Sequence, residues 1–83
     1  MLYLLKFTQY FLHTRERADR NIIKLEWIDY VINNPVKEEI QSDGRIKLWA
    51  FIEEESKFLR VILLEDRLTV HNAFFDRRFK NES

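Results

Sequence analysis

The stretch S-D-G-R-I-K-L-W-A-F-I-E, residues 42–53, decides the fold because a hairpin turn leads directly into a strand pattern. Asp-Gly is a preferred pair at the centre of a tight β-hairpin turn. The residues after it alternate between two sides, which is the period of a β-strand. One side carries Ile46, Leu48, Ala50 and Ile52, and the other carries Lys47, Trp49, Phe51 and Glu53. The stretch therefore predicts a hairpin whose second strand covers Ile46–Glu53.

Three more segments around this hairpin have the pattern of strands. Val36–Gln41 precedes it as a short mixed strand. Phe58–Leu64 is almost entirely apolar and is interrupted only by Arg60. Leu68–Phe75 follows the charged turn Glu65–Arg67 as the last predicted strand. Consecutive strands joined by short polar turns predict an antiparallel meander.

The N-terminal part has the pattern of one strand followed by two helices. Tyr3–Phe7 favours a strand, and Thr8 is the predicted N-cap of a helix over residues 9–20. Apolar residues three and four positions apart predict a second helix over Leu25–Asn33, which ends before Pro35. The order is β-α-α-β-β-β-β. We expect an α+β fold in which both helices pack on one face of the sheet.

The composition limits what the chain can be. Its 83 residues, 46% of them hydrophobic, are enough for a single small domain over residues 1–83. The absence of cysteine excludes disulfides and thiolate metal sites, and we expect neither a metal nor a cofactor. The N-terminal apolar run is too short for a signal peptide or a membrane span, so we expect a cytoplasmic protein without a membrane partner.

The charge balance bears on nucleic acid as a partner. Fourteen basic and fourteen acidic residues give a formal net charge of zero. Strong non-specific binding of nucleic acid needs several unopposed basic groups, so the balance argues against it. A local basic patch that binds nucleic acid remains compatible with a net charge of zero.

With this order of elements, several motifs resemble a known family. They are F-T-Q-Y-F-L-H-T-R-E-R at 7–17, I-D-Y-V-I-N-N-P at 28–35, D-G-R at 43–45, L-R-V-I-L-L-E-D at 59–66 and T-V-H-N-A-F-F-D-R at 69–77. The chain resembles, over Phe7–Lys80, a family of small uncharacterised prokaryotic domains that includes short cyanobacterial proteins. This family is grouped loosely with the RelE-, HigB- and BrnT-type toxins of toxin–antitoxin pairs.

The resemblance implies a RelE-like sheet with N-terminal helices and metal-independent RNA cleavage on the exposed sheet face. It also implies an antitoxin as a protein partner. The family often has a histidine after the Thr-Gln pair of the first helix, and Tyr10 occupies that position here. The family's arginine further along the helix falls on Arg15 or Arg17.

Cleavage of RNA without a metal needs a base, an acid and cations, which His, Tyr, Lys and Arg can supply. His71, Arg60 and Arg77 join Tyr10 as candidate catalytic residues. His71 is alternatively a sheet histidine with one hydrogen bond, depending on which face the helices cover. Arg60 alternatively pairs with a glutamate such as Glu53.

The charged tail Asp76-Arg77-Arg78 is a solvated flank in the simplest interpretation. Asp76 alternatively orients an arginine or a histidine across the sheet.

Four further residues are candidates for binding RNA. Lys47 and Trp49 share one side of their strand and would offer a base-stacking platform if exposed. Trp49 belongs instead to the core or to a protein interface if it is covered. Arg15 and Arg17 would bind phosphate, or simply pair with acidic neighbours on a solvated helix face.

Three functions therefore remain open from the sequence. The first is a toxin-like ribonuclease or translation inhibitor, or its degenerate descendant, held by an antitoxin. The second is a non-enzymatic module that binds a partner or forms a homodimer. The third is an RNA binder without catalysis. The resemblance favours the first, and it leaves open whether the chain is an enzyme.

Overall fold

The computed structural model describes residues 5–80, which form five strands and two helices. The elements are β1 (Lys6–Phe7), α1 (Gln9–Thr14), α2 (Leu25–Asn33), β2 (Lys37–Ile40), β3 (Ile46–Ile52), β4 (Lys57–Leu63) and β5 (Thr69–Phe75). The predicted order and the α+β class are confirmed. Tyr3 and Leu4 of the predicted first strand lie outside the described residues.

The five strands form one sheet in the order β1-β5-β4-β3-β2. From β2 to β5 the neighbours are antiparallel, as the meander predicts. β1 is parallel to β5, with Lys6 opposite Thr69 and Phe7 opposite Val70. The expectation of a purely antiparallel sheet is therefore wrong, and the sheet is mixed. The sequence of a two-residue strand contains no local pattern that indicates which edge of the sheet the strand joins.

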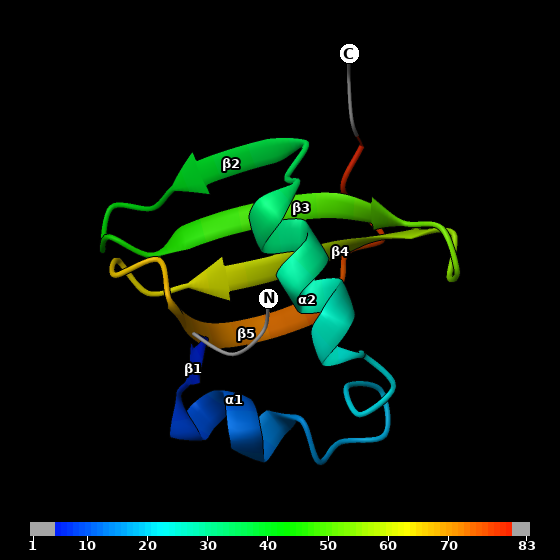
Figure 1. The fold of residues 1–83 in the computed structure, drawn as a ribbon, viewed down its shortest axis with the longest axis horizontal. Helices are drawn as coiled ribbons and strands as arrows, with labels where there is room; N and C mark the ends of the chain where they lie inside the picture. The colour runs from blue at the N-terminus through cyan, green and yellow to red at the C-terminus, as the bar shows by residue number, and fades with distance from the viewer. Residues whose placement is uncertain (1–4, 81–83) are drawn as a thin grey trace.

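One face of the sheet, called the inner face here, carries the hydrophobic core beneath α2 (Figure 1). Trp27, Ile28 and Val31 of α2 are buried against it, as their spacing predicts. The strands contribute Ile46, Leu48, Ala50, Ile52, Leu59, Val61, Leu63, Val70 and Ala73, each exposed by no more than 3%. Of the two sides of β3, the one that begins with Ile46 is thus the inner side.

α1 is shorter than predicted and lies beside the β5 edge of the sheet rather than over its face (Figure 1). Thr8 caps it as expected, because its hydroxyl accepts a hydrogen bond of 3.0 Å from the N–H of Phe11. The helix ends at Thr14 because residues 15–21 are polar apart from Ala18 and offer no apolar stripe to pack. The chain turns instead, and Ile23 enters the core.

The three hairpin turns share one form, although only one contains glycine. Each has a hydrogen bond from the N–H of its last residue to the carbonyl three residues earlier, for Gly44 to Gln41, Ser56 to Glu53 and Arg67 to Leu64. The last residue is left-handed in each turn, with φ of 91°, 53° and 61°. A turn that ends in a left-handed residue is typical of short hairpin loops.

The other face of the sheet, called the outer face here, is partly covered by the end of the chain. After β5 the chain rises behind β4 and β3, on the side away from α2 (Figure 1). Phe79 stacks on Trp49 with ring centroids 4.9 Å apart and planes 13° apart. Trp49 is only 4% exposed as a result, so the sheet has buried side chains on both faces.

Candidate functional site

His71 lies at an irregular point of the sheet, where β5 has one residue more than β4. Ile62 is opposite Asn72 and Leu63 is opposite Val70, so His71 has no partner on β4. Such a β-bulge breaks the alternation of side chains. Val70 is buried, whereas His71 and Asn72 both stay half-buried. Regular alternation would place Val70 and Asn72 on one side of the strand and His71 on the other, and the bulge breaks this arrangement.

Two residues at the start of α1 hold the His71 ring. Its Nδ1 lies 3.2 Å from the Thr8 hydroxyl, which also caps the helix. The ring of Tyr10 stacks on it, with centroids 4.9 Å apart and planes 20° apart. In the tautomer with a proton on Nδ1, the imidazole donates to Thr8 and keeps a lone pair on Nε2. Two of the predicted catalytic residues, Tyr10 and His71, are thus in contact.

The surroundings of His71 favour its neutral form. Partial burial is the main cause that lowers the pKa of the imidazole, and the positive charge of Arg45 lowers it further. Asp43 acts in the opposite direction without cancelling these effects. The pKa therefore lies below the ordinary 6.5, and the ring is largely uncharged at neutral pH. A neutral imidazole with a free lone pair can accept a proton.

Lys47 lies in the same row of the outer face as the bulge. It is opposite Ile62, and Ile62 is opposite Asn72. Neighbouring strands are about 4.8 Å apart, so the backbones of Lys47 and Asn72 are about 10 Å apart across the sheet. Lys47 is half-buried. The row brings one predicted RNA-binding cation to the same part of the outer face as His71.

Arg60 lies elsewhere on the outer face and has a partner. Its Nε donates to Asp76 at 3.0 Å, and its NH2 nitrogen forms an ion pair with the same carboxylate oxygen. Its guanidinium also lies over the rings of Trp49 and Phe74, at 5.3 and 4.9 Å from their centroids. The predicted pairing with Glu53 is wrong because Asp76 takes that place. The alternative in which Asp76 orients an arginine across the sheet is confirmed.

Asp76 also accepts a hydrogen bond of 3.0 Å from Trp49 Nε1. Burial by itself raises the pKa of the Asp76 carboxyl, but the hydrogen bonds from Trp49 and Arg60 outweigh it and leave the pKa below its ordinary value. The exposed base-stacking platform at Trp49 is not present, because its ring is buried beneath Phe79. Trp49 is therefore a buried core residue, which is the other interpretation of its position in the sequence.

The two arginines after α1 are separated from His71. Arg15 is half-buried, with its guanidinium 5.9 Å from the centroid of the Phe11 ring. One of its terminal nitrogens, NH1, is buried without a hydrogen-bond partner among the described residues. Arg17 is exposed and pairs with Asp19 at 3.5 Å. Neither contacts Tyr10 or His71 through an interaction between described residues.

Arg77 lies near the far end of β5, where it lines a hollow of about 330 Å³. The other residues of this hollow are Asp19, Arg20, Ile22, Lys57, Phe74 and Phe75. Phe75 is four residues beyond His71, which is about 13 Å along a strand. Arg20 donates to Asn72 at 2.8 Å and lies over Phe74. Arg20, at the end of the predicted first helix, was not among the candidate residues, since no local pattern shows that it reaches the sheet.

The described residues contain no group of three side chains suited to hold a metal ion. None of the helices described is both long and apolar enough to span a membrane. Comparisons with models of protein families, with curated proteins and with solved structures found no match.

Proposed function

We propose that the chain acts on RNA as a RelE-like toxin domain and cleaves it without a metal ion at His71. The observation that carries the proposal is the half-buried His71, which has a lowered pKa and is held between Thr8 and Tyr10 on a β-bulge. β-bulges often aim side chains beside active sites. The β2–β5 meander preceded by two helices is compatible with a RelE-like relationship.

In the proposed reaction His71 Nε2 takes the proton of a ribose 2′-hydroxyl. The 2′-oxygen then forms a bond to phosphorus, the bond to the 5′-oxygen breaks, and a 2′,3′-cyclic phosphate remains. Lys47 and Arg45 stabilise the negative charge on the phosphate oxygens. The Tyr10 hydroxyl donates a proton to the departing 5′-oxygen. The role places the protein in the cytoplasm, where an antitoxin would cover the outer face.

The test is cleavage of a fluorescent single-stranded RNA by purified protein and by His71→Ala. We expect the variant to be at least about 100-fold slower, because a general base contributes on that order. His13→Ala is the matched control, since His13 is the other histidine and is exposed on α1. It should cleave at the wild-type rate.

The cleavage rate in the same assay should depend on pH, in a direction that follows from the pKa of His71. Because the pKa of His71 lies below its ordinary value, the imidazole is mostly neutral at neutral pH, so the rate should be level there and fall as the pH drops through the lowered pKa. Equal cleavage by wild type and His71→Ala would contradict the proposal. RNA binding without cleavage by the wild type would favour the non-catalytic RNA binder.

A protein–protein module is the second candidate function. The observation that favours it is a set of exposed large apolar side chains, among them Tyr30, Val36, Ile40 and Phe51. If the wild type neither cleaves nor binds RNA, this candidate replaces the first.

A further inference from the structure

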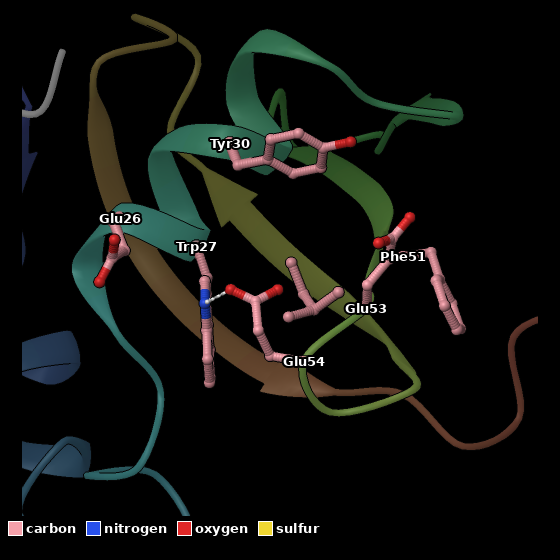
Figure 2. A pocket seen from close by; sticks show the side chains of 7 residues that line it. Glu26, Trp27, Tyr30, Phe51, Glu53 and Glu54 are labelled. Atoms are coloured by element: carbon pink, nitrogen blue, oxygen red, sulfur yellow. Dashed lines mark hydrogen bonds between the residues drawn. The ribbon is translucent and has the colours of Figure 1, made fainter.

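A hollow of about 370 Å³ lies between α2 and the end of β3, away from His71 (Figure 2). It is lined by Glu26, Trp27, Tyr30, Phe51, Ile52, Glu53 and Glu54. Three of these side chains are aromatic and three carry a carboxylate. Hollows of this volume are in the range that accepts small ligands or single side chains.

The carboxylates of the hollow have no cationic partner among the described residues. Glu54 reaches from the β3–β4 turn and accepts a hydrogen bond of 3.2 Å from Trp27 Nε1 (Figure 2). The ion pairs of the described residues include neither Glu26, Glu53 nor Glu54. The hollow thus carries three carboxylates that form no direct ion pair with a lysine or arginine of the described residues.

The aromatic walls suit a cation as well. Tyr30 is 49% exposed and Phe51 is 41% exposed, so both rings are accessible to a ligand. The Trp27 ring already attracts one cation, since the ammonium of Lys24 lies 5.3 Å from its centroid. Aromatic faces beside carboxylates recognise ammonium and guanidinium groups by cation–π attraction and ion pairing.

We propose that this hollow binds an arginine side chain of a partner polypeptide. A guanidinium can donate to a carboxylate while it lies on an aromatic ring, which matches the carboxylates of Glu53 and Glu54 in a hollow that Trp27 and Tyr30 also line. A polypeptide is favoured over a small free cation because exposed apolar surface surrounds the hollow. Tyr30 and Phe51 are part of this apolar surface. Val36 also belongs to it, since Val36 is 47% exposed and its N–H donates a hydrogen bond to the carbonyl of Trp49 in β3. The proposal does not depend on RNA cleavage.

The test is a titration of ¹⁵N-labelled protein with the capped peptide Gly-Arg-Gly, followed by NMR. The two indole N–H signals separate the sites, because Trp27 lines the hollow and Trp49 bonds to Asp76 on the outer face. We expect the Trp27 signal to shift and the Trp49 signal to stay. A single inserted side chain should bind with a dissociation constant on the order of 1 mM.

Two controls make the result specific. The same peptide with citrulline, which has the shape of arginine without its charge, should not shift Trp27. Glu54→Gln should weaken binding of the arginine peptide at least tenfold, whereas Glu16→Gln, at an exposed position after α1 that does not line the hollow, should leave the affinity unchanged. Equal shifts with arginine and citrulline, or no shift at 10 mM peptide, would overturn the proposal. If putrescine, a small free cation, binds as tightly as the peptide, the proposal that the occupant is a polypeptide would be overturned.

Discussion

Asp76 is the residue that organises the outer face. One of its oxygens accepts hydrogen bonds from both Trp49 and Arg60, and the other accepts from the backbone N–H of Arg78. Its side chain is 8% exposed, and that of Arg60 is 24% exposed. A charge buried to this extent needs its partner, because the unpaired group would remain desolvated.

Asp76→Asn should therefore destabilise the protein by about 2 to 3 kcal/mol at pH 7, since it leaves the Arg60 charge unpaired. The pKa of Asp76 is lowered in the folded state, so its contribution is complete above about pH 4 and is lost as the pH falls further. The stability difference between wild type and variant should shrink toward zero as the pH falls through the lowered pKa of Asp76. Urea unfolding at several pH values measures it.

Asp19→Asn is the matched control for this change, because the Asp19 side chain is 62% exposed in its ion pairs with Arg17 and Arg20. Exposed pairs contribute little, so its effect should stay below about 1 kcal/mol. An Asp76→Asn protein as stable as Asp19→Asn would show that the outer-face ion pair is not needed for folding.

At the scale of elements, the turns show where the chain departs from the residues that a hairpin prefers. Gly44 is suited to its φ of 91°, but Ser56 adopts the same left-handed region with a side chain. This conformation costs a residue with a Cβ about 1 to 2 kcal/mol. Glycine avoids that cost but loses more conformational entropy on folding, by about 0.5 to 1 kcal/mol.

Ser56→Gly should consequently stabilise the protein by about 0.5 to 1 kcal/mol, since relief of strain exceeds the entropy loss. Gly44→Ala should have the opposite sign, because an added Cβ would be strained at that φ and would lie 2.8 Å from Glu65 Oε2. Thermal or urea unfolding of both variants gives the comparison. A loss of stability in Ser56→Gly would contradict this account of the turns.

The elements that could be predicted are those whose signals are local. The spacing of Ile28 and Val31 placed α2, and the alternation after Gly44 placed β3. The bulge at His71 could not be predicted, because nothing in T-V-H-N-A shows that β4 lacks a residue opposite it. Of the candidate site, Tyr10 and His71 are in contact. The pairing of Asp76 with Arg60 was one of two alternatives from the sequence, and only the arrangement of the strands decides between them.

At the scale of the whole molecule, long-range contacts decide what local patterns leave open. The parallel pairing of β1 with β5 joins residues more than sixty positions apart. The cover of Trp49 by Phe79 likewise depends on the path of the chain after β5. For this reason the sequence divided β3 correctly into two sides but could not show that Trp49, on the outer side, would be buried as well.

The cover over the outer face makes a second, smaller core, and Phe79 is its outermost layer. Phe79 contacts Trp49 and the edge of Phe58, with ring centroids 4.9 Å apart in each case. Phe79→Ala should destabilise the protein by about 2 kcal/mol, less than for a fully buried phenylalanine because Phe79 is half-buried. It should also shift tryptophan fluorescence to longer wavelength, because Trp49 becomes hydrated while Trp27 stays buried.

The control for this variant is the same change on the same face at Phe51, whose ring packs edge-on against Phe58 and forms no ring pair with Trp49 among the described residues. Phe51→Ala should cost less than about 1 kcal/mol and leave the emission wavelength unchanged, since its ring is 41% exposed. If the two variants behave alike, the segment after β5 does not hold Trp49 away from water. Trp49 would then be accessible to water on the outer face, and it would again be a candidate for binding an RNA base or a partner protein.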